Sequence, residues 1–75
     1  MIAVREALSI GSKQLTGKGV INSLFETKLL IKSILRISDE DLISTSKVFL
    51  SEFEFEIFQS FLERRKKSEP IAYIL

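Results

Sequence analysis

The side chains that could do chemistry in this sequence are carboxylates, hydroxyls and amines, because cysteine and histidine are both absent. Asp39, Glu40 and Asp41 form a run of carboxylates, but consecutive positions on a helix point in different directions rather than at one metal ion. The pair Gly17-x-Gly19 is too little to make a phosphate-binding loop. Paired acid and base carboxylates need a cleft, for which 75 residues leave no spare length. The sequence therefore predicts no catalytic, cofactor-binding or metal-ligating residue, and no enzyme activity for this chain on its own.

The longest run of like charge is the basic cluster Arg64-Arg65-Lys66-Lys67. Four consecutive residues fan over most of a helix's circumference, so at most two of these side chains can contact one surface. Three interpretations stay open: a solvated helix end, an arginine paired with Glu26 or Glu69, and a docking patch for an acidic or nucleic-acid partner. The candidate partner-docking residues of the whole chain are Lys13, Lys18, Phe55, Arg64 and Arg65.

Length and charge limit the class of protein. The 75 residues suffice for one small domain. Eleven basic and ten acidic residues give a formal charge of +1, far from the excess that nonspecific phosphate binding needs, so nucleic acid is disfavoured as a partner. No apolar stretch approaches the roughly 18 residues of a membrane span, and the N-terminus lacks the residue order of a secretory signal. We therefore expect a cytoplasmic protein with no membrane partner.

The hydrophobic pattern predicts an all-α fold, a compact bundle of four to five short helices that makes residues 1–75 a single helical domain. The expected helices span about residues 2–16, 22–37, 38–45, 51–67 and 70–75. Gly17 and Gly19 are expected to end the first helix, because glycine takes positive φ without steric cost. Gly11 lies on the apolar stripe of that helix, which favours close approach of a second helix.

Capping residues mark the starts of the helices. Asn22 or Ser23 can cap the second helix, since Ser23 with Glu26 has the spacing of a capping box. Ser51 with Glu54 has the same spacing, and Ser38 is expected to cap the short third helix. The segment after Ser51 alternates as a strand would, but its capping box and the apolar positions that continue beyond it fit a helix.

Apolar residues cover most of the circumference of the helix at 22–37, so we expect this helix to be central and surrounded. The chain has six phenylalanines. We expect them mainly in the core, because each falls within an apolar arc. Phe55, at the edge of a wide arc, is the one for which exposure is the open alternative.

Four stretches spread over the chain form a combined signature. They are Val4-Arg5-Glu6-Ala7-Leu8, the acidic-x-x-Leu-Leu element Glu26-Thr27-Lys28-Leu29-Leu30, the pair Arg64-Arg65, and the closing Glu69-Pro70-Ile71-Ala72-Tyr73-Ile74-Leu75. Together they resemble the N-terminal helical domain of the HemK/PrmC family of release factor glutamine methyltransferases. The closing stretch is the most specific, and in the family it leads directly into the catalytic domain. The chain departs from the family at Asn22-Ser23, where Ser-Pro is frequent, and at Ser68, where glycine is frequent.

This resemblance implies a division of labour between two domains. Family members methylate the glutamine of the Gly-Gly-Gln motif in peptide-chain release factors, and a separate Rossmann-like domain with an Asn-Pro-Pro-Tyr motif binds S-adenosylmethionine. Neither that domain nor its motif is present in this sequence, so no cofactor is expected here. The chain thus resembles a recognition and positioning domain whose partners are release factors and its own catalytic domain. Tyr73 and Leu75 are the candidate interdomain contacts, since an apolar ending is expected to be covered.

Three hypotheses for function follow. In the first, the domain docks a release factor for an attached methyltransferase domain, and this remote binding energy orients the mobile glutamine loop. In the second, it is a structural brace for the catalytic domain through residues 71–75. In the third, it is a free-standing nucleic-acid-binding helical domain that uses Lys13, Lys18 and the basic cluster.

Overall fold

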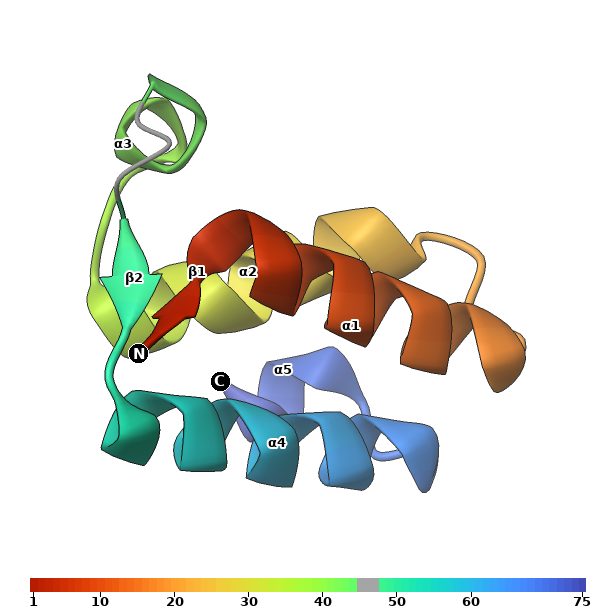
Figure 1. Cartoon of the computed structure of the whole chain (residues 1–75). Helices are drawn as coiled ribbons and strands as arrows, with labels where there is room; N and C mark the ends of the chain where they lie inside the picture. Colours follow the sequence, from red (N-terminus) through yellow and green to blue (C-terminus); the bar gives the residue numbers. More distant parts are fainter. Residues whose placement is uncertain (45–47) are drawn as a thin grey trace.

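The computed structural model describes residues 1–44 and 48–75 and shows a bundle of helices with a very small sheet at one end (Figure 1). The helices are α1 (Val4–Gly17), α2 (Ser23–Leu35), α3 (Asp39–Ser44), α4 (Glu52–Lys66) and α5 (Ile71–Ile74). The strands are β1 (Ile2–Ala3) and β2 (Phe49–Leu50). The predicted helical bundle is confirmed, and the sheet is an addition that the hydrophobic pattern does not predict.

The first helix begins later than predicted, because the residues before it pair with β2. The two strands run antiparallel, with Ile2 opposite Leu50 and Ala3 opposite Phe49. The amide N–H of Val4 then donates to the carbonyl of Val48 at 3.0 Å. These bonds tie the start of α1 to the segment that enters α4. Thr45, the predicted end of the third helix, lies outside the described residues.

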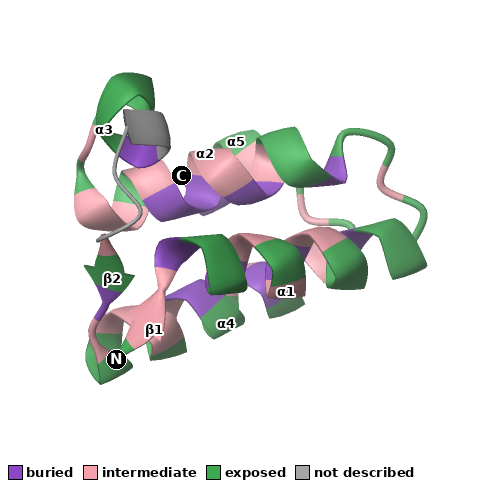
Figure 2. Ribbon diagram, turned by 45° about the horizontal axis from the view of Figure 1, so that its top comes forward, coloured by how far each residue is buried: buried purple, intermediate pink, exposed green. Residues whose placement is uncertain are grey.

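The core lies between α1, α2 and α4, whose buried faces turn toward one another (Figure 2). Its fully buried large side chains are Leu15, Leu30, Ile31, Leu50, Phe58 and Leu62. At Gly11 the helices approach closely, as predicted: a Cβ atom there would lie 2.5 Å from Cγ2 of Thr27 and 2.9 Å from Cζ of Phe58. The missing side chain therefore lets α2 and α4 pack against the backbone of α1.

The turn after α1 is a Schellman motif, which confirms the predicted helix end. The Val20 amide N–H donates to the Leu15 carbonyl and the Gly19 amide N–H to the Thr16 carbonyl, each at 3.0 Å. Gly19 has φ of 84°, a value that a residue without a Cβ adopts at no steric cost. The chain can therefore reverse tightly and lead into α2.

The end of α4 repeats this motif with serine in place of glycine. The Glu69 amide N–H donates to the Arg64 carbonyl at 3.2 Å, and the Ser68 amide N–H to the Arg65 carbonyl at 3.0 Å. Ser68 is the left-handed residue, with φ of 69°, and a side chain there is strained. The reversal directs the chain toward Pro70, the residue that precedes α5.

The capping prediction is confirmed at α3 and α4. The Glu54 amide N–H donates to Oγ of Ser51 at 3.1 Å, and the Ser51 amide N–H donates to Oε1 of Glu54 at 2.8 Å. This is a complete capping box. The Asp41 amide N–H donates to Oγ of Ser38 at 3.1 Å.

The capping prediction for α2 is wrong, because both of its side chains are used elsewhere. Asn22 holds the N-cap position, but its side chain makes no capping hydrogen bond, and Ser23 is the first helical residue. Its hydroxyl is hydrogen-bonded to the Thr16 hydroxyl at 2.6 Å. The Glu26 carboxylate turns instead to Arg65 on α4. The helix also ends at Leu35, before the predicted residue 37.

A substitution at Gly11 tests the close approach. Gly11→Ala is expected to lower the free energy of unfolding by about 1–3 kcal/mol, because the new methyl group overlaps two buried side chains. Gly17→Ala is the control, because a Cβ at Gly17 meets nothing within 4 Å; the higher helix propensity of alanine should leave it neutral or stabilise it by up to about 1 kcal/mol. Urea denaturation of both variants measures the difference, and equal stabilities would contradict the packing argument.

The strained serine gives a second prediction. Ser68→Gly is expected to raise the free energy of unfolding by about 0.5–1 kcal/mol, because glycine adopts the left-handed conformation without the Cβ penalty. The same substitution at exposed Ser60, inside α4, should cost about 0.5 kcal/mol through lost helix propensity. Thermal and urea unfolding should show opposite signs for the two variants.

Candidate interaction surfaces

The candidate surfaces for binding are formed by exposed charged and apolar side chains. Within residues 1–44 and 48–75, no three side chains of the metal-binding types are grouped around a possible ion site. In the same ranges, no helix combines the length and the apolar character that a bilayer crossing requires.

The two arginines of the basic cluster are held in ion pairs. Nε of Arg65 donates to Oε1 of Glu26 at 2.6 Å, across the contact between α4 and α2. Arg64 pairs with Glu69 and donates from Nη2 to the Tyr73 carbonyl at 3.2 Å. Both arginines therefore form an ion pair of the kind that the sequence left open: Arg65 with Glu26, and Arg64 with Glu69. These contacts fix the end of α4 to α2 and to α5.

The Glu26–Arg65 pair is the better shielded of these contacts, since both side chains are largely buried. The hydrogen bond to the Glu26 carboxylate raises the pKa of the Arg65 guanidinium above its usual value. On the arginine side, the resulting stability is present below the ordinary arginine pKa and is lost only as the pH rises beyond it. The pair therefore keeps its guanidinium charge at every pH at which proteins normally work.

The remaining lysines of the cluster differ in their contacts. Nζ of Lys66 lies 3.0 Å from Oε1 of Glu63 and donates to Oε1 of Gln14 at 3.2 Å. Lys67 is exposed at the helix end. The cluster as a whole is therefore partly neutralised by its neighbours, and it does not present four free charges to one partner.

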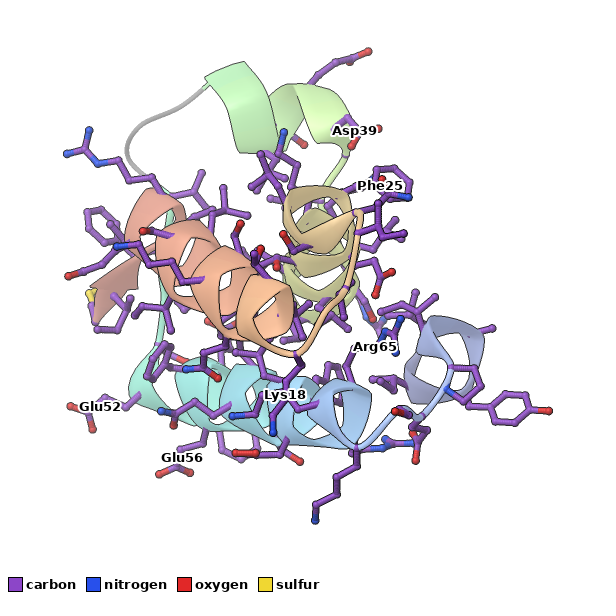
Figure 3. All side chains as sticks on the ribbon, turned by 90° about the vertical axis from the view of Figure 1, so that its right-hand side faces the viewer. Lys18, Phe25, Asp39, Glu52, Glu56 and Arg65 are labelled. Carbon is purple, nitrogen blue, oxygen red and sulfur yellow. The ribbon has the colours of Figure 1, made fainter. Side chains whose placement is uncertain are left out.

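The other docking candidates do not share one environment. Lys13 on α1 and Lys18 on the turn after it are exposed, and Figure 3 shows Lys18 at that turn. Phe55 is half-buried and packs on the core, with its ring centroid 6.0 Å from that of Phe58. The five candidates therefore divide into two exposed lysines, two paired arginines and one half-buried ring.

The prediction that most phenylalanines lie in the core is wrong for three of them. Phe25, Phe49 and Phe53 are exposed, whereas Phe58 is fully buried. Periodicity places each ring on an apolar arc, but an arc is buried only where another element covers it. In this small bundle, leucine and isoleucine side chains supply much of the core, and the outer faces of α2 and α4 stay open.

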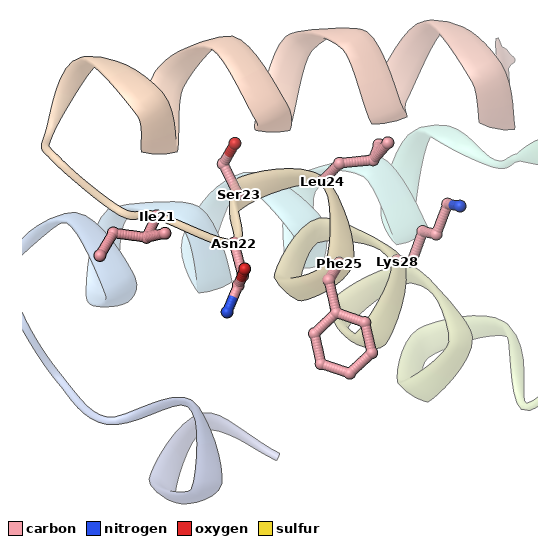
Figure 4. Close-up of a pocket in the computed structure, with 6 residues that line it drawn as sticks. All are labelled: Ile21, Asn22, Ser23, Leu24, Phe25 and Lys28. Atoms are coloured by element: carbon pink, nitrogen blue, oxygen red, sulfur yellow. The ribbon is translucent and has the colours of Figure 1, made fainter.

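An open apolar surface lies at the start of α2. Ile21, Leu24 and Phe25, which we call the apolar patch, have exposed fractions of 94%, 47% and 62%. Together with Asn22, Ser23 and Lys28 they line a pocket of about 400 Å³ (Figure 4). The prediction that α2 is surrounded is therefore wrong at its first turn. The sequence signal for this patch was that α2 has apolar residues around most of its circumference, more than its neighbouring helices can cover.

A second open surface is on α5. Tyr73 and Leu75 are exposed, whereas Ile74 between them is buried against the core. The Arg64 side chain holds the carbonyl of Tyr73. The two predicted interdomain contacts thus project from a short helix that is anchored by its neighbours.

This fold and these surfaces can be compared with known proteins. Residues 6–75 match the PrmC N-terminal domain. The chain belongs to the PrmC N-terminal domain family. The resemblance seen in the four sequence stretches is thereby confirmed, and the match extends over nearly all of the chain.

Curated relatives of this PrmC N-terminal domain carry methyltransferase names. It is 36% identical over 73 residues to a bifunctional methyltransferase of Rickettsia felis, covering 97% of this chain and 14% of that protein. The bifunctional methyltransferase of Rickettsia bellii is 33% identical over 73 residues, with coverages of 97% and 13%. The release factor glutamine methyltransferase of Coxiella burnetii is 33% identical over 75 residues, with coverages of 100% and 27%. The chain thus spans a minor part of each relative. No solved structure shows significant similarity to it.

The ion pair between α2 and α4 gives a third prediction. A double-mutant cycle with Glu26→Ala and Arg65→Ala should give a coupling energy of about 1–2 kcal/mol, because this charge-assisted hydrogen bond is partly shielded from water. The matched control is the Lys32–Asp39 pair, at 2.7 Å, whose carboxylate is exposed. Its coupling should be below about 0.5 kcal/mol. Urea denaturation of the single and double variants measures both energies, and equal couplings would refute the assigned difference.

Proposed function

We propose that this chain is the substrate-recognition and positioning domain of an S-adenosylmethionine-dependent protein-glutamine N-methyltransferase. Its substrate is the Gly-Gly-Gln glutamine of peptide-chain release factors. The observation that carries the proposal is the match of residues 6–75 to the PrmC N-terminal domain. The Coxiella burnetii relative is a release factor glutamine methyltransferase, which supports the choice of substrate.

The chemistry of the chain supports a division of labour. The sequence holds no cysteine or histidine, and its carboxylates in the described ranges serve as helix caps, ion-pair partners or exposed charges. In the proposed division of labour, methyl transfer and S-adenosylmethionine binding belong to a separate catalytic domain. What this domain contributes is binding energy remote from the reacting glutamine, which is used to orient the glutamine loop.

The rigidity of the bundle suits that role. Docking on a distant part of a substrate orients the reacting group only if the intervening structure does not bend. Here the Glu26–Arg65 pair joins α4 to α2, and the Arg64 contacts join α4 to α5. A partner held on one face of the bundle would therefore keep a fixed relation to whatever α5 contacts.

A second candidate function is a structural brace for the catalytic domain. The observation that favours it is the exposure of Tyr73 and Leu75 on an anchored helix. In this alternative the domain scarcely contacts the release factor. The third hypothesis, nucleic-acid binding, has no comparable support, because both arginines of the basic cluster are engaged in ion pairs.

Binding to a purified release factor tests the proposal. We expect saturable binding of the 75-residue chain in isothermal titration calorimetry. The double variant Lys13→Glu, Lys18→Glu should bind about three- to tenfold more weakly, because exposed charges steer and orient a complementary partner. Circular dichroism should be unchanged, since both side chains are exposed.

The controls separate the three hypotheses. Tyr73→Ser and Leu75→Ser should leave release-factor binding unchanged if the chain is a recognition domain. Absence of binding by the folded chain would contradict the proposal and favour the brace, in which these serine variants loosen the contact with a catalytic domain. Binding to RNA that falls steeply with salt would instead favour the third hypothesis.

A further inference from the structure

We propose that the apolar patch of Ile21, Leu24 and Phe25 is a docking site for an amphipathic helix with acidic flanks, contributed by a partner protein. The proposal concerns the chemistry of this surface. It stands whether or not the partner is a release factor.

Helix α2 carries apolar residues on two sides. One side, with Thr27, Leu30 and Ile31, is fully buried in the bundle. The other side carries Leu24, Phe25 and Lys28, and Ile21 in the turn before α2 borders the same pocket. Lys28 follows Phe25 by three residues and Leu24 by four, so these three side chains form one strip along the helix, the arrangement through which paired helices meet.

The apolar patch is exposed and borders a pocket. Its three apolar side chains border one common pocket of about 400 Å³ (Figure 4). A contiguous group of exposed large apolar residues on a small domain marks an interaction site. Ile21 and Leu24 are aliphatic and Phe25 is aromatic, so the occupant is expected to be apolar at its contact face.

Basic side chains surround the apolar patch. Lys28 lines the pocket itself, and Lys18 borders the adjoining hollow that also includes Ile21. Glu26 is the acidic residue next to them, and Arg65 neutralises it at 2.6 Å. The rim is therefore net positive, and the complementary occupant carries Asp or Glu beside its apolar face.

Other kinds of occupant fit less well. Two lysines neutralise few phosphates, and Phe25 is the single ring of the patch on which a base could stack, which disfavours nucleic acid. A second copy could offer the face of α4 with Glu52, Phe53 and Glu56. Figure 3 shows Glu52 and Glu56 on the opposite side of the view from Phe25, so this contact would join two different faces. Unless such contacts close a ring, they build open fibres.

Two synthetic helical peptides test the assignment. Both have the same length and the same leucine face, and one is flanked by glutamates and the other by lysines. Titrated into the isotope-labelled chain, the glutamate peptide should shift the amide resonances of residues 21–28. It should bind about tenfold more tightly than the lysine peptide at low salt.

Matched variants locate the binding surface. Phe25→Ser should weaken binding of the glutamate peptide by about tenfold or more, as expected for an aromatic anchor. Phe53→Ser is the control, because Phe53 is similarly exposed at 70% but lies on α4, and it should have no effect. Lys28→Glu should remove the preference for the glutamate peptide, whereas the matched charge reversal Arg5→Glu, at an exposed position at the start of α1, should keep it. The resonance dispersion of each variant verifies that it is folded.

Four results would overturn the proposal. They are equal binding of the two peptides, resonance shifts centred outside residues 21–28, and an equal loss of binding in Phe53→Ser and Phe25→Ser. The fourth is occupation of the patch by something else, seen as concentration-dependent shifts without peptide for a second copy, or as displacement of the peptide by single-stranded RNA.

Discussion

The structure depends on the close contact of three helices at Gly11. Because this residue has no side chain, Thr27 of α2 and Phe58 of α4 both reach the backbone of α1. Thr27 is fully buried, and its hydroxyl donates to the Ser23 carbonyl at 2.7 Å, so its burial leaves no unpaired donor. One contact thus fixes how α1, α2 and α4 meet, and the leucines and isoleucines of the core fill the space around it.

A core of this size leaves the ends of the helices to be held by other means. At one end, two short strands and the Val4–Val48 hydrogen bond tie α1 to the segment before α4. At the other end, Arg65 reaches Glu26, and Arg64 reaches α5. The charges that first suggested a docking cluster are therefore largely engaged in holding the bundle together.

The sequence predicts best what is decided locally. The Ser51–Glu54 capping box, the Ser38 cap and the glycine turn after α1 depend on residues within a few positions of one another, and all three form. The strands β1 and β2 are a tertiary pairing between distant segments, and neither carries a pattern long enough to identify it. Ser23 fails as a cap for the same reason, since Thr16 across the turn takes its hydroxyl.

The periodicity of a sequence does not show which face of a helix is covered by another element. The candidate surfaces are apolar faces that stay uncovered. An apolar stripe at Phe25 and one at Phe58 look alike in sequence, but only the second meets other helices. The uncovered stripe on α2 and the exposed side chains at α5 belong to different elements. If the apolar patch holds a partner while α5 contacts a catalytic domain, the rigid bundle between them sets the distance over which recognition can place a substrate. In that arrangement, the Glu26–Arg65 pair acts on orientation without touching either partner.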